Sequence, residues 1–126
     1  MPGTLEHVNV TVTDARKTTE LAMRLFDWHI RWEGEAIHGG HTIHVGSDDN
    51  YVAIYQMKDQ TPAPVSNYAH TGGLNHIGVV VDDLDAVEER VKAEGLVPMN
   101  HGDYEPGRRF YFDDHDGVEW EVISYG

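Results

Sequence analysis

Histidine is the reactive residue type that this sequence supplies in excess. The 126 residues include nine histidines and no cysteine. Two of them, His7 and His76, stand at the same place in two similar segments, LEHVNVTVTD at 5–14 and LNHIGVVVDD at 74–83. Neutral imidazole suits iron, manganese, nickel, cobalt and zinc, whereas the absence of cysteine excludes thiolate metal sites and cysteine nucleophiles. The repeated histidine is therefore the first candidate for chemistry.

Both segments alternate with a period of two, which predicts half-buried β-strands. In each segment β-branched residues form one face and the histidine lies on the other. The β-branched positions are Val8, Val10 and Val12 in the first segment and Ile77, Val79 and Val81 in the second. If helices cover the β-branched faces, both histidines look into whatever the sheets enclose.

Each strand is followed by a helix signal and then by three more strand-like segments. Asp14 is an N-cap candidate for the first helix, Asp82 or Asp83 for the second, and Gly95 is expected to end the second. The strand-like segments are at roughly 30–33, 41–46 and 51–57, and at roughly 97–101, 108–113 and 118–124. The predicted fold class is α+β, with two tandem βαβββ modules.

We place module one at about 4–57, a connector rich in Pro, Gly and polar residues at about 58–73, and module two at about 74–126. Each module alone is too small to bury much apolar surface. We therefore expect the two modules to pack together, either within one chain or across a dimer.

The charge balance limits the classes of partner that the chain is expected to bind. Nine Lys and Arg against 22 Asp and Glu give a net charge of −13. Such a chain neutralises phosphates poorly, so we expect no nucleic-acid partner and no docking on anionic membranes. No apolar run is long enough to span a membrane and no export segment is recognisable, so we expect a cytoplasmic protein with a small-molecule substrate.

The segment FYFDDHDGVEWEV at 110–122, together with the repeated strand at 74–83, resembles the vicinal oxygen chelate superfamily. This superfamily includes glyoxalases, extradiol dioxygenases, and fosfomycin- and bleomycin-resistance proteins. Its members often carry Asp-Pro-Asp-Gly before a strand with a glutamate. Here the turn runs from Asp114 to Gly117 with His115 in place of proline, and Glu121 follows. The resemblance implies one domain, 1–126, whose modules form a cupped, barrel-like mixed sheet with helices outside.

The resemblance also implies a metal site held by His7, His76 and Glu121, with Glu119 as the rival carboxylate. A fourth ligand would come from module one, but the matching positions, Ile54 or Tyr55, coordinate metals poorly, and Gln56 requires a shift of two residues. Two histidines and one carboxylate leave metal positions open for an oxygen substrate. We expect one divalent ion, with Fe(II) or Mn(II) favoured and Zn, Ni or Co as alternatives.

The reaction predicted from the resemblance acts on a substrate chelated through two neighbouring oxygens. Extradiol dioxygenases carry a tyrosine ten residues before the glutamate, and Tyr111 stands there, which favours ring cleavage. An acid–base histidine would be His101, with His70 as the alternative. Substrate contacts are expected from Asn9, Tyr55 and Arg109.

Two other functions stay open. One is a glyoxalase-like isomerase or lyase that works through an enediolate, and the other is a binding or resistance protein without catalysis. Fosfomycin-resistance proteins need cations for a phosphonate, and no Lys or Arg follows Glu121 in the sequence. A homodimer is the expected assembly, since twofold symmetry is the commonest.

Overall fold

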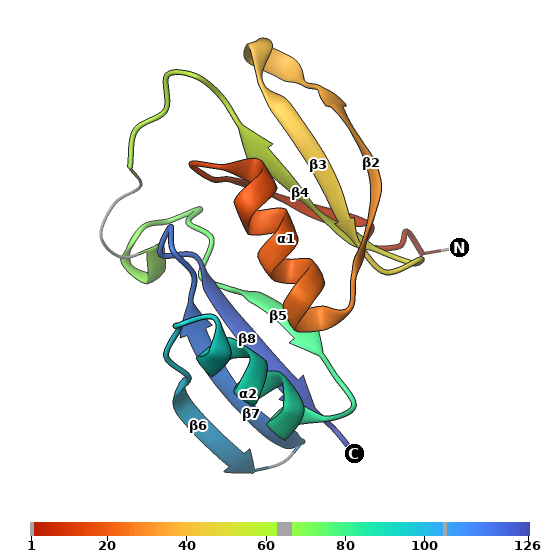
Figure 1. The fold of residues 1–126 in the computed structure, drawn as a ribbon, viewed down its shortest axis with the longest axis vertical. Helices are drawn as coiled ribbons and strands as arrows, with labels where there is room; N and C mark the ends of the chain where they lie inside the picture. Colours follow the sequence, from red (N-terminus) through yellow and green to blue (C-terminus); the bar gives the residue numbers. More distant parts are fainter. Residues whose placement is uncertain (1, 63–66, 105) are drawn as a thin grey trace. The chain divides into compact units, whose positions relative to one another are not determined.

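The computed structural model describes residues 2–62, 67–104 and 106–126 (Figure 1). The chain divides into two compact units, residues 1–61 and 62–126. The boundary falls inside the predicted connector, of which residues 63–66 lie outside the described residues. Over the described residues, each unit contains one α-helix and one four-stranded sheet.

The first unit has the element order β-α-β-β-β. Its elements are β1 (His7–Thr11), α1 (Ala15–Phe26), β2 (His29–Glu35), the short 3-10 helix η1 (Ile37–Gly39), β3 (His41–Gly46) and β4 (Tyr51–Gln56). The strand order in the sheet is β1-β4-β3-β2. β1 runs parallel to β4, and the other neighbours are antiparallel.

The second unit repeats this plan. Its elements are the 3-10 helix η2 (Asn67–Ala69), β5 (Ile77–Val80), α2 (Leu84–Ala93), β6 (Met99–Tyr104), β7 (Gly107–Asp113) and β8 (Glu119–Ser124). The strand order is β5-β8-β7-β6, again with one parallel pair, β5 and β8. The predicted α+β class and both βαβββ modules are confirmed.

The two helices begin where the sequence predicts. The side chain of Asp14 accepts from the Lys17 amide, and that of Asp83 accepts from the Ala86 amide at 3.0 Å. Each cap satisfies one of the amides that a helix start leaves unpaired. Gly95 follows the end of α2 with φ of +81°, a conformation that glycine adopts without strain.

Apolar stripes hold each helix on its own sheet. On α1 the buried residues include Leu21, Ala22 and Leu25, and this helix packs on β3 and β4. On α2 they are Leu84, Val87 and Val91, and this helix packs on β7 and β8. In both units the β-branched strand residues therefore face the helix, which leaves the opposite face of each sheet for other contacts.

A buried aspartate fixes the turn that leads into β8. Asp114 is 5% exposed, and its Oδ1 accepts from the amides of Asp116 and Val118 at 2.9 and 3.0 Å. Its Oδ2 accepts from Nε1 of Trp120 at 3.1 Å. Burial raises the pKa of Asp114 despite these three bonds. The turn sets the direction in which β8 presents its glutamates.

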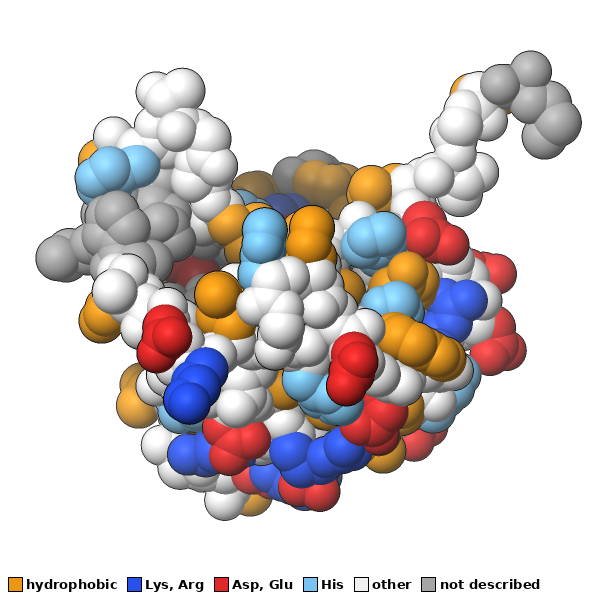
Figure 2. Space-filling model, turned by 90° about the horizontal axis from the view of Figure 1, so that it is seen from above, with side chains coloured by type: hydrophobic (Ala, Val, Ile, Leu, Met, Phe, Trp, Pro, Cys, Tyr) orange, Lys and Arg blue, Asp and Glu red, His pale blue; other side chains and the backbone are white. Residues whose placement is uncertain are grey.

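The surface carries charges of both signs. Figure 2 shows acidic and basic side chains next to one another on one face, with histidine side chains among them. Among the ion pairs are Arg16 with Glu33 and Lys92 with Glu88. None of the helices in the described part of the chain has the length and apolar character needed to cross a membrane.

Candidate metal centre

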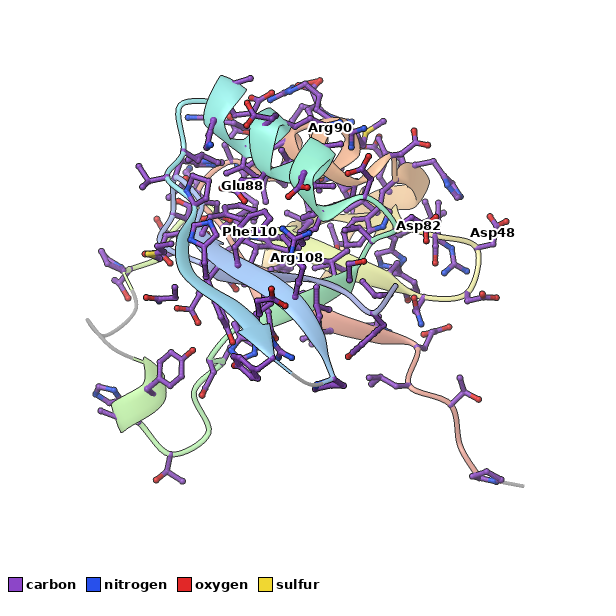
Figure 3. The ribbon with its side chains drawn as sticks, turned by 90° about the horizontal axis from the view of Figure 1, so that it is seen from below. Asp48, Asp82, Glu88, Arg90, Arg108 and Phe110 are labelled. Atoms are coloured by element: carbon purple, nitrogen blue, oxygen red, sulfur yellow. The ribbon has the colours of Figure 1, made fainter. Side chains whose placement is uncertain are left out.

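Alternation along β7 decides which of its residues can share a site. Phe110 is fully buried, and Nη2 of Arg108 donates to Asp85 on α2 at 2.9 Å, so both side chains lie on the helix side of the sheet (Figure 3). The intervening residues Arg109 and Tyr111 therefore point to the opposite face.

His76 and Glu121 meet on this opposite face. His76 directly precedes β5, and Glu121 lies on β8 across from Gly78. Nε2 of His76 is 3.3 Å from Oε1 of Glu121, and the two side chains are 31% and 13% exposed. Bonds of about 2.1 Å to a metal place neighbouring donors about 3.0–3.4 Å apart. The spacing of the two atoms fits two ligands of one ion.

The second oxygen of Glu121 is held from two sides. Nη1 of Arg109 and the hydroxyl of Tyr111 each donate to Oε2 at 3.0 Å. Burial raises the pKa of Tyr111, and the bond to Glu121 raises it further, so the phenol stays protonated and remains a donor. With Oε2 occupied in this way, Oε1 is the oxygen that faces His76.

Two more groups approach Nδ1 of His76. The hydroxyl oxygen of Tyr68, in η2, lies 3.2 Å from this nitrogen, and Oε2 of Glu119 lies 3.5 Å from it. Tyr68 also donates to Oε2 of Glu119, and this bond raises the pKa of Tyr68 to about 12. We call the group the His76 cluster; its members are Tyr68, His76, Arg109, Tyr111, Glu119 and Glu121.

The first unit presents His7 differently. Nδ1 of His7 is 2.9 Å from Oε1 of Glu6, which also accepts from the Tyr51 hydroxyl at 3.2 Å. The His7 ring stacks on the Tyr51 ring with centroids 4.9 Å apart. Because Nδ1 is hydrogen-bonded to Glu6, Nε2 is the His7 nitrogen that could bind a metal.

The strand register identifies the residue of module one that occupies the position equivalent to Glu121. Gly78 pairs with Glu121, and Asn9, its counterpart in β1, pairs with Ala53. The counterpart of Glu121 is therefore Ala53, which is buried and has no donor atom. The sequence alignment of the preceding turns had matched Glu121 with Ile54, which is one residue after Ala53. Ile54 is buried in the core.

Gln56, the remaining candidate for a fourth ligand, is already used. Its Oε1 accepts from the amide of Ala15 at 2.7 Å, at the start of α1. Over its described residues, neither unit brings together three His, Cys, Asp or Glu side chains that could hold a metal. Within the described part of module two, His76 and Glu121 therefore form a pair of candidate donors.

Comparison with known proteins places this geometry in a family. Residues 4–122 match the profile of the Glyoxalase/Bleomycin resistance protein/Dioxygenase superfamily. The chain belongs to this superfamily. The resemblance inferred from residues 74–83 and 110–122 is thereby confirmed. No curated protein matches the chain significantly.

Solved structures agree on the fold. A glyoxalase/bleomycin resistance protein/dioxygenase domain from Frankia sp. EAN1pec has a TM-score of 0.83 at 18% identity, with both chains covered completely. The fosfomycin resistance protein FosX from Mesorhizobium loti has a TM-score of 0.71 at 26% identity, covering 98% of this chain and 92% of that one. FosX from Listeria monocytogenes has a TM-score of 0.74 at 20% identity, covering 100% and 96%.

The predicted substrate contacts of this superfamily member have different surroundings. Asn9 is exposed on the His7 face of its sheet. Tyr55 lies on the same face, but its hydroxyl donates to the Ile37 carbonyl at 2.6 Å and the side chain is buried. Arg109 is paired with Glu121, and its Nε and Nη2 are buried without a hydrogen-bond partner among the described residues. Of the three, Asn9 is the most accessible to a substrate.

His101, the predicted acid–base residue, lies away from the His76 cluster. Its Nε2 is 3.0 Å from Oε2 of Glu88 on α2, and its ring stacks on Phe110 at 6.0 Å. A register shift in β6 between Met99 and Gly102 accompanies this placement on the helix side of the sheet. The geometry gives His101 no contact with Glu121.

Sequence reasoning missed two residues of interest. His44 pairs with Ala53 as Tyr111 pairs with Glu121, and its ring stacks on Tyr51 with centroids 4.4 Å apart. Burial lowers the pKa of His44, and the neighbouring His7 lowers it further. Matching the third strands of the two modules would have revealed His44. No comparable signal marks Tyr68, because it lies in the connector.

Proposed function

We propose that this chain is a metal-dependent enzyme of the superfamily, with residues 1–126 acting as one domain. A divalent ion would be held by His7, His76 and Glu121. The observation that carries the proposal is the 3.3 Å approach of His76 Nε2 to Glu121 Oε1, with the second carboxylate oxygen already held by Arg109 and Tyr111. Two imidazoles and one carboxylate are a donor set that Fe(II) and Mn(II) favour and that Zn, Ni and Co also accept.

A related protein supports the choice of a divalent ion. The FosX of Listeria monocytogenes has been solved in complex with Mn(II) and sulfate. When bound, such an ion polarises and orients a substrate that binds through oxygen. Three protein ligands leave room for two neighbouring substrate oxygens, so the substrate class is a small molecule such as a catechol or an enediol.

The residues of the His76 cluster have defined tasks in this proposal. Arg109 and Tyr111 orient Glu121 and offset its negative charge. Tyr111 is also the residue expected to contact a catecholate, and to do so its hydroxyl must exchange Glu121 for the substrate. Ring cleavage is therefore the first reaction to test, and an enediolate isomerase or lyase is the alternative.

The likeness to FosX raises fosfomycin-type chemistry as a second candidate. The net charge of −13 and the pairing of Arg109 with Glu121 both weigh against an anionic phosphonate as the substrate.

We propose that the protein is cytoplasmic and forms a homodimer. The metal site would be formed either within one chain or by His7 of one protomer with His76 and Glu121 of its partner.

Metal content is the decisive first experiment. Protein purified anaerobically and without a tag should hold about one divalent ion per chain by elemental mass spectrometry, and the His76→Ala variant should hold almost none. Iron or manganese would direct the next assays to oxygen consumption with catechols. Zinc, nickel or cobalt would direct them to enediolate isomerisation. Metal-free wild type, even after reconstitution, would reduce the protein to a binding module.

A further inference from the structure

Tyr68 connects the segment between the modules to the candidate metal centre. It lies in η2, eight residues before His76, and its hydroxyl contacts both His76 Nδ1 and Glu119 Oε2. Glu119 lies one residue before the paired strand position Trp120–Ile77, which brings it beside His76. The Glu119 side chain is 17% exposed, so water competes weakly for its oxygens.

The donor and acceptor capacities of Tyr68, Glu119 and His76 determine where the hydrogens lie in this chain of contacts. A phenol has one hydrogen to donate, and the Tyr68 hydroxyl donates it to the Glu119 carboxylate, which can only accept. The contact at 3.2 Å between the Tyr68 oxygen and Nδ1 of His76 must then be a bond donated by Nδ1–H. In a neutral imidazole that carries its proton on Nδ1, Nε2 bears a lone pair.

The consequence appears on the other side of the ring. Nε2 of His76 and Oε1 of Glu121 are then two acceptors that face each other at 3.3 Å. Two lone pairs at this distance repel unless a proton or a metal ion lies between them. The arrangement of Tyr68 and Glu119 therefore prepares His76 to bind a metal through Nε2.

We propose that Tyr68 and Glu119 are positioning residues for His76, which hold its proton on Nδ1 so that Nε2 faces the metal. The proposal rests on the proposed metal-binding function and assigns to Glu119 a role other than that of a ligand. Partners of this outer kind orient a ligating histidine, and removing one typically weakens metal binding by about 10–100-fold.

The tautomer of His76 can be measured without any metal. Nitrogen-15 correlation spectra of the metal-free protein, recorded at about pH 8.5, report which ring nitrogen of a neutral imidazole carries the proton. We expect Nδ1–H for His76 in the wild type and a shift toward Nε2–H in Tyr68→Phe. The His76→Gln variant assigns the signal. An unchanged tautomer in Tyr68→Phe would overturn the proposal.

Metal affinity gives the second readout. Titration of the metal-free protein with Mn(II) should show a dissociation constant about tenfold higher for Tyr68→Phe. Tyr125→Phe is the matched control, because Tyr125 is exposed and lies about 20 Å from Glu119 along the strand direction. We expect Tyr125→Phe to bind Mn(II) like the wild type, and an equal loss in both variants would overturn the proposal.

A third variant separates the two roles of Glu119. Glu119→Gln keeps an oxygen that accepts from the Tyr68 hydroxyl, so a positioning role predicts Mn(II) affinity within about threefold of the wild type. Loss of Mn(II) binding greater than that of Tyr68→Phe would make Glu119 a ligand and overturn its assignment. If the wild type binds no metal while the Nδ1–H tautomer is present and depends on Tyr68, the proposed function fails and the positioning contact stands.

Discussion

The two modules share one backbone plan and differ on the face that the helix does not cover. Their strand orders and registers correspond, from β1-β4-β3-β2 to β5-β8-β7-β6. On that face, Glu121 of module two corresponds to Ala53 of module one, and Tyr111 corresponds to His44. Both modules keep a histidine before or at the start of the first strand. Module two places the strand residue Glu121 beside Nε2 of its histidine. Module one has Glu6 beside Nδ1 of His7 and stacks the Tyr51 ring on the imidazole.

The difference shows where the repeat is constrained. The buried strand residues on the helix side are apolar in both modules because they form each core, as Ile43 and Ile54 do in one and Phe110 and Val122 in the other. The opposite face carries no such requirement, so its chemistry can diverge without disturbing the strands. The proposed ligand set, with two donors from one module and one from the other, would be an example of such divergence.

The largest effect should come from removing the carboxylate that distinguishes module two. Glu121→Ala deletes a proposed ligand and leaves Arg109, which is 14% exposed, without its counter-ion. Since loss of an outer partner costs about 10–100-fold, loss of the ligand should cost more than about 100-fold in Mn(II) affinity. Titration of the metal-free protein measures this effect. Glu121→Gln, which still accepts from Arg109 and Tyr111, separates lost coordination from lost orientation, and full metal binding by Glu121→Ala would refute the site.

The turns that lead into β4 and β8 offer the next contrast. Asp114→Ala removes three acceptor contacts inside a buried turn and should lower the free energy of unfolding by about 2–4 kcal/mol. Ser47 closes the corresponding turn of module one at an exposed position, and Ser47→Ala should cost less than about 0.5 kcal/mol. Urea denaturation of both variants measures the two losses in the free energy of unfolding. Equal losses would contradict the expected difference between the two turns.

The Asp114 turn should also respond to pH. Because burial raises the pKa of Asp114, the folded state binds this proton more tightly than the unfolded state does. The resulting stability is present below the unfolded pKa of about 3.9 and is lost as the pH rises through the folded pKa. The stability difference between the wild type and Asp114→Ala should therefore narrow from pH ~4 to pH ~7. A difference that widens over this range would contradict the assigned direction.

Orientation of the carboxylate is expected to matter less than its presence. Tyr111→Phe removes one of the two bonds to Oε2 of Glu121 and keeps the ring in place. We expect about a tenfold loss of Mn(II) affinity, equivalent to about 1.4 kcal/mol, with an unchanged melting temperature. Equilibrium titration and calorimetry measure the two quantities. Affinity equal to that of the wild type would mean that Arg109 alone holds Glu121.

Periodicity and capping residues were sufficient to predict both helices and the two βαβββ modules, because these features depend on local spacing. The same alternation placed His76 on the face opposite the β-branched residues, where the structure brings it to Glu121. The setting of His101 could not be predicted, since a register shift in β6 reverses the alternation. The correspondence between Ala53 and Glu121 was missed because the alignment of the turns before β4 and β8 is one residue out of step with the strand register. The contacts of Tyr68 depend on a connector that has no periodic pattern.

The smallest effect should come from His44, which tests whether module one offers a second donor. Burial lowers the pKa of His44, so the ring is neutral near pH 7 and chemically able to ligate. Its closest ring contacts are with Tyr51 at 4.4 Å and Trp32 at 5.2 Å, which indicates a packing role. His44→Phe retains an aromatic ring and should therefore leave Mn(II) affinity within about twofold of the wild type. A tenfold loss, which corresponds to about 1.4 kcal/mol, would instead make His44 a ligand and give module one two donors of its own.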